Sequence, residues 1–282
     1  MYGKGIKTEE QHQADNEFIE TVIERYGSLD SAARVHVELG WSYFYNNDLS
    51  AAMKRFNQAW LLDSSKADPY YGFSALTRVS NEAEANRLEK LALQRDPRKK
   101  RAKSCYHHAA NCMESIGKLE HIIYYYGKLI ELDQTEAFYY KKRGYIYSQT
   151  NALHKAVQDY THALDLDPAD ALVYNNRGYV YQRLKQFDPA YDDYSKAIEL
   201  NPEYLSAIIN RALTLRSMNM PKLALADVNR CIDIEPNHAP FYAIKGSIQL
   251  ELGEIDDACK AIATALSMGD TSAAELYEAH CP

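Results

Sequence analysis

The stretch "YNNRGYVYQRLKQFDPAYDDYSKAIELNP", Tyr174–Pro202, decides the fold class. Apolar and aromatic side chains recur every three or four residues on both sides of the polar turn "RLKQFD", as they do along one face of an α-helix. The stretch therefore predicts two amphipathic helices joined by a short turn. Two helices cannot bury their apolar faces alone, so this hairpin requires neighbours of a similar kind.

Such neighbours exist, because the pattern returns along the chain with a fixed period. Pro168, Pro202 and Pro236 are spaced 34 residues apart. Small residues recur with the same period in both helices, where they let the two helix axes approach closely. They are Gly144, Gly178, Ala212 and Gly246 in the first helix, and Ala156, Ala190, Ala224 and Ala258 in the second. Stacked helix pairs of this kind predict a solenoid.

These residues resemble the tetratricopeptide repeat, in which a large residue, a small residue and a Tyr are followed by Ala, an aromatic residue, Ala and Pro. The resemblance implies an all-α fold, a right-handed α-solenoid of about seven helix-turn-helix units with capping helices at both ends. The units are expected at residues 33–65, 66–102, 103–136, 137–170, 171–204, 205–238 and 239–272. The second unit fits the pattern least well.

Residues 1–32 are expected to form an N-terminal cap. Thr8 is followed by Gln11, which is the spacing of a capping box, and Gly27 is a stop signal for the helix that would lie between them. One amphipathic helix is therefore expected from Thr8 to Tyr26.

Residues 273–282 are expected to form a C-terminal cap. Ser272 and Glu275 suggest a second capping box, for a short helix that ends near His280. Cys259 and Cys281 lie at equal distances before and after Asp270, where the last hairpin turns. They could form a disulfide in an oxidising compartment, or Cys281 could fray with the end of the chain.

Three arginines occupy a position that usually holds Leu in the family. Each of Arg143, Arg177 and Arg211 has an Asp sixteen residues later, namely Asp159, Asp193 and Asp227. Where the Arg is replaced, the Asp is replaced as well: Lys245 goes with Ala261, and Ala109 with Tyr125. An unpaired buried charge is costly, so the joint change predicts an ion pair across the two helices of each unit. Arg177 is therefore assigned a structural role.

The family resemblance also implies a concave groove lined by the first helix of each unit. The candidate peptide-binding residues are Lys141, Tyr145, Asn175, Asn176, Tyr179 and Asn210. Their amides, hydroxyls and ammonium group suit the backbone of an extended protein segment. The alternative is a solvated face without a ligand.

One specialised groove of the family can be compared with this sequence. Family members that capture the acidic tail of the large heat-shock chaperones use a clamp of two Lys, two Asn and one Arg. Lys141 and Asn176 match the clamp. Tyr145, Ser206 and Asn210 stand where Asn, Lys and Arg are required. A chaperone-tail adaptor is therefore not expected.

Composition and motifs argue against other functions. The 282 residues carry a formal net charge of −7, which disfavours nucleic acid and anionic membranes as partners, and no apolar run is long enough for a membrane span. Nine His occur without an HExxH motif or a nucleophile elbow. Cys105, His108 and Cys112 share one helical face, but a metal site needs a fourth ligand, and buried packing is the simpler interpretation.

The prediction is a non-enzymatic scaffold without catalytic residues, metal or cofactor, whose partner is a protein or peptide. The alternatives are an enzyme that uses scattered His and Cys, and a helical-repeat RNA binder. The sequence carries no signal for an oligomeric state.

The N-terminus "MYGKGIKTEE" lacks an apolar signal core, so the cytoplasm is the default expectation. The alternative is a periplasmic or secreted protein whose leader was removed. The basic run Arg95–Lys103 could serve localisation or anion binding, or could be a solvated turn.

Overall fold

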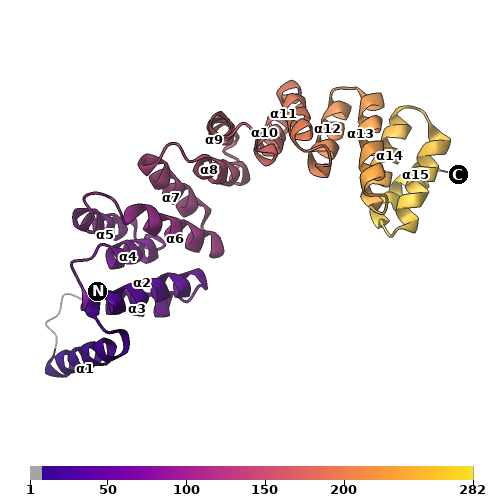
Figure 1. Ribbon diagram of the computed structural model, residues 1–282. Coiled ribbons are helices and arrows are strands. Elements are labelled where there is room, and N and C mark those ends of the chain that lie inside the picture. Colours follow the sequence, from indigo (N-terminus) through magenta and orange to yellow (C-terminus); the bar gives the residue numbers. More distant parts are fainter. Residues whose placement is uncertain (1–7, 282) are drawn as a thin grey trace. The chain divides into compact units, whose positions relative to one another are not determined.

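The computed structural model describes residues 8–281, which form helices joined by short turns with no strand among them (Figure 1). The chain divides into two compact units, Met1–Tyr139 and Tyr140–Pro282. Within each unit, consecutive helices pack as hairpins and the hairpins stack on one another. The fold is the α-solenoid that the 34-residue period predicts.

The first unit contains seven complete helices. They are α1 (Glu9–Tyr26), α2 (Leu29–Tyr45), α3 (Leu49–Leu62), α4 (Asp68–Arg78), α5 (Glu82–Arg95), α6 (Ala102–Ser115) and α7 (Leu119–Leu132). The hairpins pair α2 with α3, α4 with α5, and α6 with α7. Close helix contact requires glycine here: a Cβ on Gly40 would lie 2.6 Å from the Phe56 ring, and one on Gly72 would lie 2.5 Å from it.

Helix α4 is enclosed within the first unit. Nearly all of its side chains are buried, because α2 and α6 both pack on it and also contact each other. The contact between α2 and α6 includes stacking of the Trp41 and His108 rings, whose centroids are 5.6 Å apart. The Cys112 Sγ lies 3.7 Å from the Trp41 carbonyl oxygen. The inner helices of this unit therefore close over α4 and leave no open face along it.

The second unit contains most of α8 and all later helices. They are α8 (Ala137–Gln149), α9 (Leu153–Leu166), α10 (Ala171–Arg183), α11 (Phe187–Leu200), α12 (Leu205–Ser217), α13 (Pro221–Ile234), α14 (Ala239–Glu251), α15 (Ile255–Ser267) and α16 (Ala274–His280). Bulky side chains of the outer helices fill the space beside the small residues of the inner ones. A Cβ on Gly178, for example, would lie 2.9 Å from the Tyr194 ring.

The N-terminal cap forms as its sequence predicts. The Thr8 side chain accepts a hydrogen bond from the Gln11 backbone N–H, and the Gln11 side chain accepts one from the Thr8 N–H. Helix α1 ends at Tyr26, and Gly27 follows with a φ of 78°, which suits glycine. The cap packs on the first hairpin through Phe18 and Val22.

The predicted C-terminal capping box is wrong. Asp270, not Ser272, supplies the capping carboxylate, and Ser272 donates to it through both its backbone N–H and its hydroxyl. A 3₁₀ turn, Thr271–Ala273, follows, so α16 begins only at Ala274, without a side-chain cap. The helix ends at His280, as expected.

A disulfide joins Cys259 of α15 to Cys281, with their Cα atoms 5.6 Å apart. This bond is the first of the two alternatives that the sequence leaves open. In residues 8–281, no helix is both long enough and apolar enough to cross a membrane.

Candidate functional site

The predicted ion pairs between the two helices of one repeat are confirmed. Arg177 donates to Asp193 through Nε and Nη2, with both distances 2.8 Å. Arg143 holds Asp159 in the same two-point geometry, and Arg211 holds Asp227. The carboxylates are buried, and the pairs set the relative height of the two helices in three successive hairpins.

Two of these arginines also bond to the preceding hairpin. The Nη1 of Arg177 donates to the Thr161 hydroxyl at 3.0 Å, and the Nη1 of Arg211 donates to the Ser195 hydroxyl at 3.2 Å. One guanidinium therefore connects three helices. The signal in the sequence is a hydroxyl residue sixteen positions before the Arg, which sequence reasoning overlooked.

The two tyrosines of the predicted groove are well exposed. Tyr145 is 45% exposed on α8 and Tyr179 is 47% exposed on α10. Each directly follows the inner-helix glycine of its repeat, so the two rings occupy equivalent places one repeat apart. The ring of Tyr179 also lies beside the guanidinium of Arg183, 5.8 Å from its centroid. The pair offers flat apolar surface with polar edges.

The asparagines contact one another. Asn175 is only 8% exposed, and its Oδ1 accepts a hydrogen bond of 3.1 Å from Nδ2 of Asn210. Its own Nδ2 lies 3.4 Å from Oδ1 of Asn176, which is half-buried. The expectation that Asn175 projects into a groove is therefore wrong, because its amide is turned into the interface between α10 and α12. Asn176 and Asn210 lie at the edge of this amide cluster.

Lys141 is neutralised within the protein. Its Nζ lies 2.6 Å from Oδ2 of Asp170. Asp170 also caps α10, since its Oδ1 accepts from the Val173 backbone N–H at 3.1 Å. The ammonium group thus connects α8 to the start of α10. Because it is already paired with a carboxylate, it is less available to contact a ligand.

Further contacts between inner helices were not predicted from the sequence. Arg183 donates from α10 to the Ser148 carbonyl oxygen at 2.7 Å and to Oδ1 of Asn151 at 2.9 Å. Arg216 of α12 forms an ion pair with Glu251 of α14. In each case the partners are about one repeat apart, so the period could have suggested them. These contacts connect neighbouring inner helices of the second unit and hold them in fixed positions relative to one another.

In residues 8–139, the aromatic residues that follow an inner-helix glycine are covered. Trp41 and Phe73 follow Gly40 and Gly72, as Tyr145 and Tyr179 follow their own glycines, but both are buried under the contact between α2 and α6. Of the four described aromatic residues that follow an inner-helix glycine, only Tyr145 and Tyr179 are therefore exposed.

The cysteines of the inner helices are buried. Burial raises the pKa of Cys112 to about 12, and burial is also the main cause that raises the pKa of Cys105. No group of three or more His, Cys, Asp or Glu in residues 8–281 is arranged to hold a metal ion.

Comparisons with known proteins agree with this geometry. The sequence matches the family model described as "Tetratricopeptide repeat" over residues 171–204, and the model described as "TPR repeat" over residues 144–185. The chain therefore contains tetratricopeptide repeats (TPRs). No curated protein matches its sequence significantly.

Solved structures show that the TPR fold is shared. MamA is 23% identical over 58% of this chain and 96% of its own, with a TM-score of 0.56. A MamA fragment from Desulfovibrio magneticus RS-1 is 13% identical, covers 59% of this chain and 94% of its own, and has a TM-score of 0.57. YrrB, described as a TPR protein with an unusual peptide-binding site, is 23% identical over 62% of this chain and 90% of its own, with a TM-score of 0.55.

Proposed function

We propose that this TPR protein is a scaffold that binds an extended segment of another protein on the inner face of its second unit. The observation that carries the proposal is the exposed pair Tyr145 and Tyr179, held one repeat apart on braced helices. Two equivalent aromatic rings, exposed on neighbouring repeats, offer apolar contact surface along which an extended segment could lie. YrrB, which shares the fold, is described as having a peptide-binding site.

The two rings suit the side chains of an extended peptide. Tyrosine supplies a large contact area at a low cost in conformational entropy, and it is enriched among the residues that dominate binding energy. The edge of the amide cluster at Asn176 and Asn210 suits the peptide backbone, whose N–H and C=O groups need partners once they leave water. Lys141 and Asn175 have no direct part in this proposal. No catalytic step belongs to it either.

The first test is partner capture followed by affinity measurement. Proteins retained by the immobilised chain would be identified, and the bound segment would be synthesised as a peptide. The double substitution Tyr145→Ala with Tyr179→Ala should weaken peptide binding at least tenfold, which corresponds to about 1.4 kcal/mol. Melting temperature should hardly change, because neither ring is buried.

The matched control is Tyr45→Ala. Tyr45 is 57% exposed at the end of α2, in the unit whose inner helices are closed. Its loss should leave the affinity unchanged. Equal weakening by both variants, or wild-type affinity in the double variant, would place the ligand elsewhere.

The disulfide bears on the compartment in which the scaffold works. A bond between Cys259 and Cys281 persists in an oxidising environment, such as the periplasm or the extracellular space, and is reduced in most cytosols. We therefore favour the periplasmic or secreted alternative over the cytoplasmic default. Fractionation of the source cells, with the oxidation state of this pair measured in each fraction, tests the assignment.

A further inference from the structure

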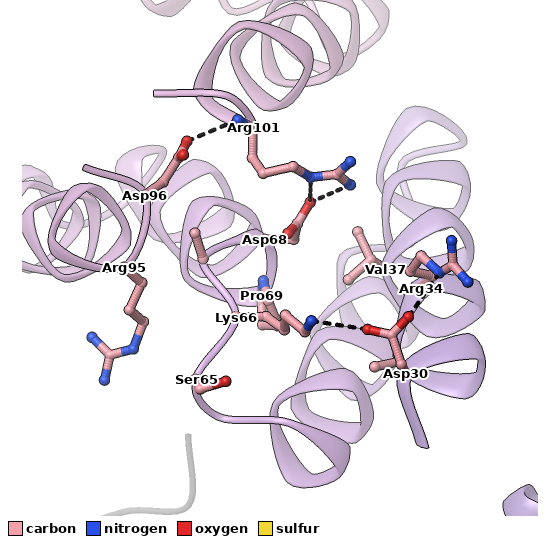
Figure 2. A pocket seen from close by; sticks show the side chains of 12 residues that line it. Asp30, Arg34, Val37, Ser65, Lys66, Asp68, Pro69, Arg95, Asp96 and Arg101 are labelled. Atoms are coloured by element: carbon pink, nitrogen blue, oxygen red, sulfur yellow. Dashed lines mark hydrogen bonds and ion pairs between the residues drawn. The ribbon is translucent and has the colours of Figure 1, made fainter. Parts of the chain in front are cut away.

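A pocket of about 300 Å³ lies in the first unit, whereas Tyr145 and Tyr179, here called the tyrosine face, belong to the second. Its walls come from α2, from the turn before α4 and the first residues of α4, from the end of α5 with the residue that follows it, and from the residue before α6 (Figure 2). It opens beside the N-terminal end of the enclosed helix α4. Its size suits one side chain or a small molecule rather than a folded partner.

The floor of the pocket is apolar and fixed. Ala33, Val37, Ala67 and Pro69 line it, and all four are buried. Three of these residues belong to packed helices, and Ala67 directly precedes α4. Because all four carry few rotatable bonds, the floor keeps its shape when a ligand enters. A short branched aliphatic group is the kind of body that such a surface accepts.

The rim carries an excess of positive charge. The lining includes Arg34, Lys66, Arg95 and Arg101 as cations and Asp30, Asp68 and Asp96 as carboxylates. These four positive and three negative charges leave one positive charge in excess on a chain whose formal net charge is −7. A monoanion is therefore the complementary ligand.

The carboxylates of the lining are already engaged. Asp30 lies 2.9 Å from Lys66 Nζ and 3.4 Å from Arg34 Nε, and Arg101 holds Asp68 at 2.6 Å (Figure 2). Asp96 is buried and accepts backbone hydrogen bonds from Lys100, Arg101 and Ala102 at 2.8, 2.8 and 3.0 Å. A cation would therefore have to displace existing bonds to reach these carboxylates.

Two guanidinium groups remain accessible at the opening. The Arg34 side chain is 65% exposed, and its Nε lies 3.4 Å from Oδ2 of Asp30. Arg101 is also exposed, and its Nε and Nη2 both meet one oxygen of Asp68. Figure 2 shows Arg34 of α2 beside Asp30, and Arg101, which directly precedes α6, beside Asp68. Guanidinium groups bind carboxylates through paired N–H donors.

The basic run Arg95–Lys103 is explained in part by this arrangement. The three backbone hydrogen bonds to Asp96 fix the turn and so place Arg101 over the pocket. Arg98, Lys99 and Lys100 lie exposed in the same turn and add positive potential next to the opening.

We propose that this pocket binds a carboxylate carried on a short branched aliphatic body, with the apolar part on the Val37 floor and the carboxylate between Arg34 and Arg101. The ligand could be a free short-chain acid or the C-terminal residue of a peptide, since both present this chemistry. The site does not depend on the tyrosine face, which lies in the other unit.

The test is titration of the full-length chain with three probes, followed through the methyl NMR signals of Val37. The probes are isovalerate, the tripeptide acetyl-Ala-Ala-Val with a free carboxylate, and the same tripeptide as its C-terminal amide. The buried Val180 of the second unit is the internal reference. We expect saturable Val37 shifts with isovalerate if a free acid suffices, or with the free tripeptide alone if a peptide end is required. The tripeptide amide should not shift the Val37 signals.

Substitutions separate this site from general attraction to positive charge. Arg34→Ala should weaken binding at least fivefold while leaving the fold intact, because its side chain is mostly in solvent. Arg98→Ala is the matched control, since Arg98 is exposed in the same basic turn but does not line the pocket, and it should change the affinity less than twofold. The proposal is overturned if neither isovalerate nor the free tripeptide shifts Val37. Equal binding of the amide, or equal effects of the two substitutions, would overturn it too, as would binding of inorganic phosphate alone.

Discussion

At the scale of single residues, the Arg177 guanidinium stabilises the fold because a buried carboxylate faces it. Burial raises the pKa of Asp193, and the hydrogen bonds from Arg177 oppose that rise. Arg177→Ala would leave Asp193 buried without its partner, which should cost about 3–5 kcal/mol in the free energy of unfolding. The double variant Arg177→Leu with Asp193→Ala should recover much of this loss.

Urea denaturation of Arg177→Leu, of Asp193→Ala and of the double variant gives the coupling energy of the pair. The exposed pair Lys196 and Glu199 is the control, since its loss should cost about 0–1 kcal/mol. Additive losses for Arg177 and Asp193 would contradict the pairing.

His36 makes the stability of the first hairpin depend on pH. The side chain is buried beside Phe18 and Tyr26 of α1, and neither ring nitrogen has a hydrogen-bond partner among the described residues. Burial, helped by the positive charges of Arg55 and Arg25, lowers the pKa of His36 from 6.5 to about 4. The unfolded chain therefore binds a proton at a higher pH than the folded chain.

The contribution of His36 to the free energy of unfolding should be constant above about pH 6.5. It should fall as the pH drops from 6.5 towards 4. The loss should be on the order of 1–3 kcal/mol. Unfolding free energies at pH 7 and pH 4.5 for the wild type and for His36→Phe measure it, because the variant keeps the ring but not the titration. Equal pH slopes in the two proteins would exclude His36 as the cause.

At the scale of elements, the final helix α16 is held by packing and by one covalent bond. Leu276 and Tyr277 pack against Ile262 of α15, and the disulfide joins residues 22 apart in sequence. In the chain-entropy account, a closed loop of this length contributes about 3 kcal/mol. Cys281→Ser should therefore destabilise the C-terminal end by a similar amount.

Thiol counting tests the bond directly. The denatured, unreduced chain should show three reactive thiols, from Cys105, Cys112 and Cys231. Hydrogen exchange with and without reductant should show loss of protection in α15 and α16 alone, since repeats contact only their neighbours. Five reactive thiols would refute the bond.

At the scale of the whole molecule, the two units offer different inner faces. In the first unit α2 and α6 meet over α4, whereas in the second unit Tyr145 and Tyr179 stay exposed. A photo-reactive phenylalanine analogue placed at Tyr179 should cross-link to the captured partner, and the same analogue at Tyr45 should not. Cross-linking at Tyr45 with none at Tyr179 would move the binding face to the first unit.

The 34-residue period of the sequence was sufficient to predict the contacts within a hairpin. Two helices joined by a short turn meet at a register that the turn determines, so the sixteen-residue spacing of Arg177 and Asp193 already predicts their pairing. The small residue at the closest approach of each helix pair, Gly178 or Ala212 for example, follows from the same register. The N-terminal capping box could likewise be predicted from the sequence, because its atoms lie within one helical turn.

Contacts between hairpins were decided by the tertiary structure. Whether an inner-helix side chain is open or covered depends on the angle between successive hairpins, and many side-chain volumes set that angle together. For this reason Trp41 and Tyr179, at matching positions, are respectively buried and exposed, and Asn175 turns into an interface where the sequence predicts an exposed amide. The sequence alone determined the repeat and its internal pairing, while the stacking of the repeats determined which faces remain free to bind.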